Sequence, residues 1–162
     1  MRTALVTGAT SGIGFEVARL LLEAGFFVIG TGRDEPRCEA ARSLLNGHKD
    51  NIIFLPCDNS GLKQVCALAD KVREILSQRG LPLDVLINNA GCYTSKKAVT
   101  EEGLETQLAV NYVSAYLLTR LLLPLLFKSP SARVISVSSK SHYLTRFGAS
   151  ILKPPSPYVG LI

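Results

Sequence analysis

The sequence contains no tryptophan and no run of basic residues, although its formal net charge at neutral pH is +5. Its 18 lysines and arginines are spread along the chain among 13 acidic residues. Proteins that bind nucleic acids usually cluster their positive charge and place aromatic side chains within the cluster. The scattered charges therefore argue against a nucleic-acid partner.

Cysteine is also scarce, with four residues at Cys38, Cys57, Cys66 and Cys92. They form no Cys-x-x-Cys pair, and their spacing from the two histidines is not that of a metal site. So few cysteines in 162 residues are typical of reduced thiols in a cytosolic protein. We therefore expect no metal site and a cytoplasmic location.

Long apolar segments are missing as well. The N-terminus reaches Gly8 before the apolar region of a signal peptide can form, so we expect none. The apolar stretch at 115–127 is too short to cross a bilayer and contains Arg120. We predict that it is a buried helix. Association with a membrane surface stays open, without support in the sequence.

Short apolar runs that alternate with longer helical periods indicate an α/β protein. The strands are predicted at 3–7, 26–31, 51–58, 83–91 and 133–139, and the helices at 15–25, 36–47, 62–80 and 103–128. Apolar runs separated by helices indicate parallel strands that are covered on both faces. Right-handed crossovers then give a doubly wound Rossmann sheet of order 3-2-1-4-5.

The segment VTGATSGIG at 6–14 joins the first strand to the first helix. Gly8 permits a sharp turn, Gly12 lets a pyrophosphate approach the backbone, and Gly14 lets the helix pack on the sheet. The N–H groups at the start of the helix favour an anion. A glycine turn can also serve only to connect a strand and a helix, but its place in a βαβ unit favours nucleotide binding.

Four motifs in order resemble the classical short-chain dehydrogenase/reductases: TGATSGIG, NNAG at 88–91, Asn111 and VSS at 137–139. The resemblance covers residues 3 to about 140, and SSKSHYL is most similar to the branch of retinol dehydrogenases. It implies a nicotinamide-dependent oxidoreductase acting on an alcohol or carbonyl of a lipophilic substrate. The oligomeric state stays open, a homo-oligomer included.

The resemblance also implies which residues contact the cofactor. They are Gly8, Ser11, Gly12, Ile13, Gly14, Arg33, Asp58, Asn89, Ala90 and Gly91. Asp58 would contact the adenine amino group, although an aspartate at this place can also cap the following helix. Asn88 can instead be a structural amide that ties neighbouring strands together.

The end of the second strand favours NADP over NAD. An NAD site usually has an acid there, whereas this chain has Gly32 followed by Arg33, whose guanidinium suits a 2′-phosphate. Two observations count against this choice. Ser11 stands where some NADP-preferring members of the family have a second basic residue, and Asp34 could pair with Arg33.

The resemblance implies two catalytic residues, Ser139 and Asn111. Ser139 lies at the carboxyl end of the fifth strand, where its hydroxyl would polarise the substrate carbonyl. Asn111 would hold a water of the proton relay. The alternative for Asn111 is a buried amide satisfied by backbone groups.

The resemblance implies an acid/base pair downstream of Ser139, a tyrosine followed four residues later by a lysine, and this pair is absent. Tyr143 is followed at that distance by Phe147, and Tyr158 by Ile162. We therefore expect residues 1–139 to be an incomplete nucleotide-binding domain with an uncovered sheet edge, and 140–162 a loop that leads to a missing catalytic helix. The chain would be the N-terminal part of a longer enzyme, truncated before the last strands and inactive alone. The alternative is a catalytically inactive protein that binds cofactor or partners.

Overall fold

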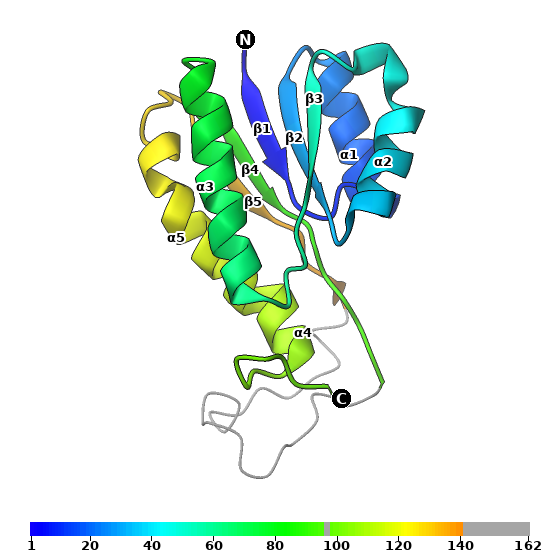
Figure 1. Ribbon diagram of the computed structural model, residues 1–162. Coiled ribbons are helices and arrows are strands. Elements are labelled where there is room, and N and C mark those ends of the chain that lie inside the picture. The colour runs from blue at the N-terminus through cyan, green and yellow to red at the C-terminus, as the bar shows by residue number, and fades with distance from the viewer. Residues whose placement is uncertain (96–97, 141–162) are drawn as a thin grey trace.

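A computed structural model describes residues 1–95 and 98–140 (Figure 1). The predictions for 141–162, including those for Tyr143 and Tyr158, lie outside these residues. The strands are β1 (Thr3–Val6), β2 (Phe27–Gly32), β3 (Ile52–Pro56), β4 (Val85–Asn88) and β5 (Arg133–Ser136). The helices are α1 (Gly12–Glu23), α2 (Glu35–Leu44), α3 (Leu62–Gln78), α4 (Thr106–Leu108) and α5 (Ser114–Leu126). A 3-10 turn, η1, covers Asn46–His48, and a π-helical turn, η2, covers Ala109–Val113.

The five strands form one parallel sheet of order β3-β2-β1-β4-β5, which confirms the predicted topology. Most strands are shorter than predicted, because the chain leaves the sheet where the polar segments begin. The fourth strand was predicted to continue to Gly91 but ends at Asn88. The following residues form a loop at the carboxyl edge of the sheet.

Helices cover both faces of the sheet, with α3 and α5 on one side and α1 and α2 on the other (Figure 1). Side chains alternate between the two layers, as the pleat of a strand requires. Leu5 belongs to the core beneath α3 and α5, whereas its neighbours Ala4 and Val6 belong to the core beneath α1 and α2. Burial on both faces explains why the strands read as continuous apolar runs.

The helical run from α4 through α5 lies within the predicted helix at 103–128 and is slightly shorter at both ends. It extends over 106–126, 21 residues that are long and apolar enough to cross a membrane by length and composition alone. The stretch at 115–127, which was expected to be too short, is therefore part of a longer apolar helical run, although core helices of soluble proteins pass the same test. One face of α5 nevertheless belongs to the core, because Leu118 and Leu122 are buried against α3 and the sheet.

Turn residues end the helices largely as predicted. Gly25 follows α1 with a φ of 78°, the left-handed conformation that glycine adopts without strain. Pro36 lies in the first turn of α2, where its missing N–H costs no hydrogen bond. Gly47 was predicted just past the end of a longer helix, but α2 stops at Leu44 and Gly47 lies in η1.

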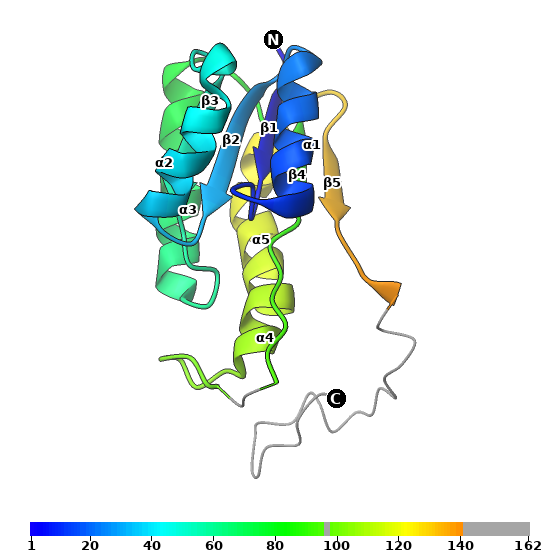
Figure 2. The ribbon, with the colours of Figure 1, turned by 90° about the vertical axis from the view of Figure 1, so that its right-hand side faces the viewer.

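The edge strand β5 is exposed along its whole length (Figure 2). Val134 and Ile135 keep 45% and 44% of their surface accessible, although both are apolar. In contrast, Thr3–Val6 in the central strand is buried at every position. The predicted uncovered sheet edge is therefore present at β5.

A buried carboxylate connects three segments of the fold. Asp84, only 7% exposed, accepts hydrogen bonds from the backbone N–H of Thr3 at 2.7 Å and from the Ser129 hydroxyl at 2.6 Å. The backbone N–H of Asp84 in turn donates to the Thr3 hydroxyl at 3.2 Å. The start of β1, the approach to β4 and the residues after α5 are thus held together at the amino end of the sheet.

Replacing Asp84 with alanine should destabilise the fold, because two buried donors lose their acceptor. We expect the free energy of unfolding in urea to fall by about 3 kcal/mol. The matched control is Asp70→Ala, which removes an exposed carboxylate paired with Arg73 on α3 and should cost less than about 1 kcal/mol. Similar losses for the two variants would show that the Asp84 contacts do not stabilise the sheet.

Candidate functional site

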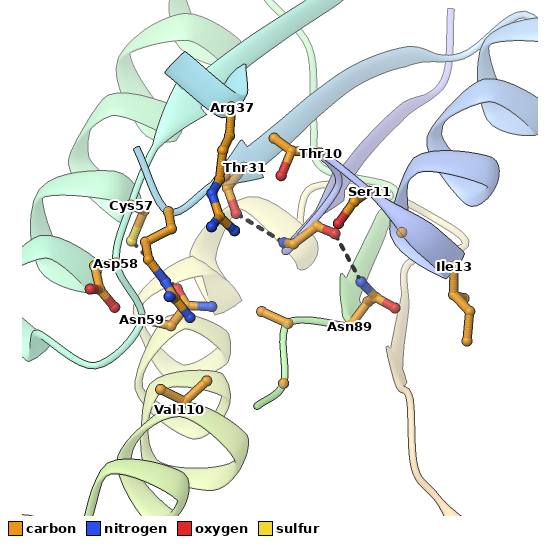
Figure 3. Close-up of a pocket in the computed structure, with 16 residues that line it drawn as sticks. Thr10, Ser11, Ile13, Thr31, Arg37, Cys57, Asp58, Asn59, Asn89 and Val110 are labelled. Atoms are coloured by element: carbon orange, nitrogen blue, oxygen red, sulfur yellow. Dashed lines mark hydrogen bonds between the residues drawn. The ribbon is translucent and has the colours of Figure 1, made fainter. Parts of the chain in front are cut away.

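A cavity of about 320 Å³ lies at the carboxyl ends of β1, β2, β3 and β4 (Figure 3). The direction of the strand order reverses here between β1 and β4, the place where open α/β sheets bind their ligands. Nine of the predicted cofactor residues line it: Gly8, Ser11, Ile13, Gly14, Arg33, Asp58, Asn89, Ala90 and Gly91. Gly12, the tenth predicted cofactor residue, does not line the cavity. The lining also includes Thr10, Thr31, Gly32, Arg37, Cys57, Asn59 and Val110.

The glycine turn is packed too closely to admit side chains at two positions. Gly8 has a φ of 66°, and a Cβ atom built on it would lie 3.0 Å from Cα of Ala90. A Cβ atom on Gly14 would lie 2.3 Å from the Gly8 carbonyl oxygen and 2.4 Å from Nδ2 of Asn89. The missing side chain at Gly14 therefore lets the start of α1 pack directly against the glycine turn. The prediction was a contact between this helix and the sheet.

Asn89 holds this turn against the end of β4. Its side-chain Nδ2 donates to the carbonyl oxygens of Thr7 and Gly8, at 2.9 and 3.2 Å. The Thr7 hydroxyl oxygen accepts from the backbone N–H groups of Asn89 and Ala90, each at 3.0 Å. These four bonds fix the backbone of the phosphate turn relative to the loop after β4.

The structural role predicted for Asn88 is different in the structure. Its Nδ2 donates to the Thr119 hydroxyl at 3.0 Å, so it ties β4 to α5 and not to a neighbouring strand. Between these two adjacent asparagines, the one that supports the site is Asn89. Side chains of consecutive residues point to opposite faces at the end of a strand, so Asn88 and Asn89 point in different directions. The sequence motif alone does not reveal which of the two supports the site.

The start of α1 can receive an anion. Ser11 is the N-cap residue, and its side chain makes no capping hydrogen bond. The first turn of α1 contains no acidic residue. The positive end of the helix dipole therefore faces the cavity without a nearby carboxylate on that turn to offset it.

Gly32 at the end of β2 has no room for a side chain. A Cβ atom there would lie 2.3 Å from Cγ2 of Thr10 and 3.0 Å from Sγ of Cys38. An acid at this position would have to displace Thr10. The close packing explains the glycine and excludes a carboxylate from this corner of the cavity in the present geometry.

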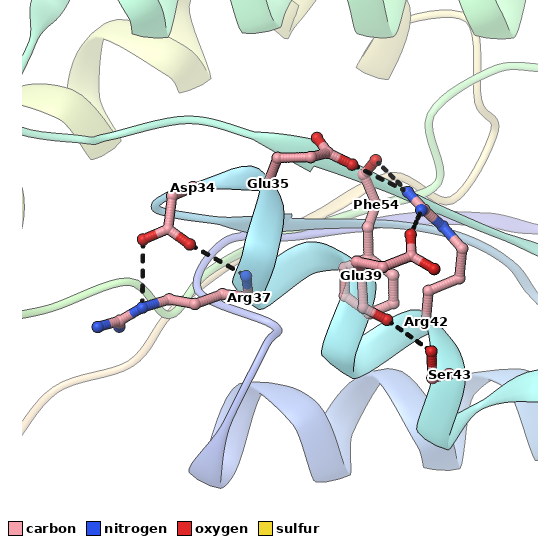
Figure 4. A network of polar contacts seen from close by, with 7 residues as sticks. All are labelled: Asp34, Glu35, Arg37, Glu39, Arg42, Ser43 and Phe54. Carbon is pink, nitrogen blue, oxygen red and sulfur yellow. Dashed lines mark hydrogen bonds and ion pairs between the residues drawn. The ribbon is translucent and has the colours of Figure 1, made fainter.

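The predicted alternative that Asp34 pairs with Arg33 is wrong. Asp34 contacts Arg37 instead, at 3.3 Å between Oδ2 and Nε (Figure 4). None of the ion pairs found between described residues includes Arg33, which lines the cavity. Among the described residues, no carboxylate is paired with the Arg33 guanidinium at the cavity.

Asp58 lines the cavity but does not cap the helix that follows it. The N-cap of α3 is Gly61, and Oδ1 of Asp58 accepts a hydrogen bond from the backbone N–H of Ser60 at 2.9 Å. The backbone N–H of Asp58 donates to the Gln64 side chain at 2.9 Å. These local bonds orient the Asp58 carboxylate at the end of β3.

Asn111 lies on the π-helical turn η2 and is bound to the loop after β4. Its Oδ1 accepts from the Cys92 N–H at 2.8 Å, and its Nδ2 donates to the Cys92 carbonyl at 2.9 Å. The alternative of a buried amide is correct about the backbone partners but wrong about burial, because Asn111 is exposed. Ser139 follows β5 and is also exposed. Neither residue lines the cavity described above.

All four cysteines are free thiols. Burial, helped by the nearby Asp58 carboxylate, raises the pKa of the Cys57 thiol to about 12. Burial also raises the pKa of Cys92, with Glu105 acting in the same direction and the Arg33 charge opposing it. The two thiols near the cavity are therefore protonated at neutral pH and are poor nucleophiles. The described residues also contain no cluster of histidine, cysteine and acidic side chains that could hold a metal.

Replacing Gly14 with alanine should damage the turn, because the new methyl group would overlap the Gly8 carbonyl. We expect a loss of about 2 kcal/mol in the free energy of unfolding and a clear loss of NADPH affinity in a fluorescence titration. Gly47→Ala is the matched control, since nothing lies within 4 Å of its Cβ position. Unchanged NADPH affinity in Gly14→Ala would place the pyrophosphate elsewhere.

The chain is similar to known proteins of one family. The family model for short chain dehydrogenases matches residues 2–150. Mouse (Mus musculus) polyprenol dehydrogenase is 40% identical over 149 residues, which are 88% of this chain and 43% of that protein. Human (Homo sapiens) retinol dehydrogenase 13 is 38% identical over 145 residues, 87% of this chain and 42% of that protein.

Solved structures show the same arrangement of strands and helices. The NADP active-site complex of Pseudomonas aeruginosa RhlG is 36% identical with a TM-score of 0.71, covering 85% of this chain and 54% of that one. The NADPH-bound carbonyl reductase from chicken fatty liver is 28% identical with a TM-score of 0.72, covering 87% and 60%. The chain thus spans about half the length of the relatives that it matches.

Proposed function

The chain belongs to the short-chain dehydrogenase family, and from this we propose that it forms the cofactor-binding part of an NADP(H)-dependent oxidoreductase. The enzyme would transfer hydride between NADP(H) and an alcohol or carbonyl group of a lipophilic substrate. The observation that carries the proposal is the end of β2, where a closely packed Gly32 is followed by Arg33 at the cavity.

The choice of NADP(H) rests on charge and space at that corner. A ribose 2′-hydroxyl is usually recognised by an acid at the end of the second strand. Gly32 has no such side chain, and Thr10 and Cys38 occupy the space that one would need. Arg33 supplies a guanidinium, which binds phosphate through paired hydrogen bonds. The NADP and NADPH complexes among the structural relatives support the same choice.

The cavity residues fit the remaining parts of such a cofactor. The start of α1 and the turn around Gly8 would hold the pyrophosphate, and Asp58 would meet the adenine amino group. The backbone of Asn89, Ala90 and Gly91 would lie along the nicotinamide ribose. When bound, a nicotinamide supplies or accepts the hydride.

Ser139 and Asn111 are proposed to serve the reacting end. Ser139 follows β5 at the carboxyl edge of the sheet, where its hydroxyl could donate to a substrate carbonyl oxygen. Asn111 would act by holding the loop after Gly91 through its two bonds to Cys92, with η2 leaving the helix irregular at this point. Such π-helical turns occur frequently at functional sites.

A lipophilic substrate is suggested by the names of the relatives, polyprenol dehydrogenase and retinol dehydrogenase, which refer to apolar alcohols. The free thiols support a reducing, cytoplasmic setting. Both statements are proposals for the whole protein, because this chain spans about half the length of those relatives.

Arg33→Ala should weaken NADPH binding much more than NADH binding. The loss of one charge-assisted contact to phosphate corresponds to about 2 kcal/mol, or roughly thirtyfold in the dissociation constant. Titrations with both cofactors would measure the effect, with Arg73→Ala on α3 as a control outside the cavity. If Arg33→Ala weakened both cofactors to the same extent, the preference for NADP(H) would be wrong.

The 162-residue chain should bind NADPH without catalysing hydride transfer. After Ser139, where the family has its acid/base pair, the sequence contains no tyrosine with a lysine four residues later, and an unassisted tyrosine with a pKa near 10 is a poor base at neutral pH. General acid/base catalysis typically contributes about a hundred- to ten-thousandfold. NADPH oxidation with aldehydes and ketones would be compared with full-length mouse polyprenol dehydrogenase. Comparable turnover by the 162 residues would locate an acid/base group within them.

A further inference from the structure

Four basic residues that are distant in the sequence lie at the amino edge of the sheet. They are Arg2 before β1, Arg79 at the end of α3, Lys128 after α5 and Arg133 at the start of β5, and we call their surface the basic face. We propose that the basic face binds an anionic phospholipid surface. This inference does not rest on the NADP(H) binding proposed above, because it concerns the edge of the sheet opposite the cavity.

Hydrogen bonds around Asp84 bring three of these segments together. The buried Asp84 carboxylate accepts from the backbone N–H of the residue after Arg2 and from the serine hydroxyl of the residue after Lys128. The Asp84 carbonyl accepts from the Arg133 N–H at 2.8 Å. Each of these three basic residues therefore lies at, or next to, a group that is bonded to the same aspartate.

Cation–π contacts fix the guanidiniums of Arg2 and Arg79. The guanidinium carbon of Arg2 lies 4.3 Å from the centre of the Phe26 ring, and that of Arg79 lies 4.2 Å from the centre of the Phe27 ring. Both rings are buried, and the Phe27 N–H donates to the Arg2 carbonyl at 2.9 Å. A guanidinium that stacks through its face keeps the N–H groups along its edge for another acceptor. The two arginines therefore hold a fixed position in which they can still bind a phosphate.

The basic face differs from the other charged surfaces of the helices in its ion pairs. Five basic residues elsewhere pair with acids: Arg19, Arg37, Arg42, Lys71 and Arg73. In contrast, none of the ion pairs found between described residues includes a member of the basic face, and all four members are exposed. Their positive charges therefore face solvent without carboxylates bound to them in the described part of the chain.

The acidic residues near the amino edge do not cancel these charges. Asp84 is buried beneath the surface and bound by its hydrogen-bond donors, so it reduces the positive field without pairing with a basic side chain. Glu23, at the end of α1, pairs with Arg19. Asp50 is exposed beside Lys49, whose charge offsets it. The basic face therefore keeps a net positive charge.

Exposed apolar side chains lie next to the charges of the basic face. Phe127, directly before Lys128, is 81% exposed, and Met1, directly before Arg2, is 64% exposed. Proteins that bind the surface of a bilayer combine such residues, because the apolar groups enter the headgroup region while the cations attract anionic lipids. A nucleic acid offers negative charge without an apolar layer for these side chains. The combination therefore favours a bilayer as the partner.

The position of the basic face leaves the cofactor cavity accessible. Figure 1 shows the N-terminus and the end of α3 at the end of the molecule opposite α4. The cavity lies at the carboxyl ends of the strands. A protein bound to a bilayer through its basic face would therefore keep the cavity open to the cofactor in solution.

The alternative is that these basic side chains only offset the negative ends of the helix dipoles. Arg79 and Lys128 follow α3 and α5, where a cation is stabilising. This explanation does not apply to Arg2 and Arg133, which lie at the starts of strands. If it were sufficient, reversing the charges would change the stability of the fold and leave lipid binding unaltered.

The test measures co-sedimentation of the full chain with phosphatidylcholine vesicles that contain about 30% phosphatidylserine, and with vesicles of phosphatidylcholine alone. We expect binding to the anionic vesicles only, and weaker binding at high salt. Replacing Lys128 and Arg133 together by glutamate should weaken this binding roughly thirtyfold. The matched control replaces Lys63 and Arg120 by glutamate, which changes the net charge equally at two exposed residues outside the basic face.

Phe127→Ser distinguishes a bilayer from other anionic partners, because it removes an apolar group and keeps every charge. It should weaken binding to the anionic vesicles roughly tenfold. If the chain bound a DNA duplex more tightly than these vesicles and Phe127→Ser changed neither affinity, the partner would be a nucleic acid and the inference wrong. The inference is also overturned if the unaltered chain does not bind anionic vesicles, or if the two double variants lose affinity equally. Urea unfolding curves would show that each variant is folded.

Discussion

The contact between the first helix and the turn before it sets the geometry on which the cavity depends. Gly14, in the first turn of α1, lies so close to Gly8 that no Cβ atom fits between them, and the Asn89 side chain lies against the same contact. A larger residue at Gly14 would have to move the helix start, the turn or the loop after β4. Because all three line the cavity, one steric constraint positions the backbone that forms this side of the site.

Two cores on opposite faces of the sheet keep this corner rigid. Leu5 packs with α3 and α5, and Val6 packs with α1 and α2, so β1 is held from both sides immediately before the turn. At the opposite end, Asp84 fixes the start of β1 to the approach to β4. The polar chemistry can therefore occupy loops at the carboxyl edge, while the strands beneath them are anchored by apolar burial and one buried carboxylate.

Charge at the cavity is arranged by local pairs and not by the net charge of the chain. Asp34 is occupied by Arg37, which leaves Arg33 without a described carboxylate partner. Gly32 leaves no room for an acidic side chain at the end of β2, and the cavity lining there includes Arg33 and Arg37 but not Asp34. The same arrangement explains how arginines that are scattered in the sequence can come together at one cavity.

The sequence by itself determined the sheet order, the helices between the strands and many of the residues that line the cavity, because these follow from apolar periodicity and from recognisable motifs such as the glycine turn. Only the tertiary structure decided which polar side chains meet. It showed that Asn89, and not Asn88, supports the glycine turn, and that Asp34 selects Arg37 over the adjacent Arg33. The direction of the Asn89 side chain depends on packing between segments distant in the chain, whereas the choice of Arg37 by Asp34 depends on the geometry of the helix cap. Arg37 was missed for this reason, although it lies one helical turn beyond Arg33.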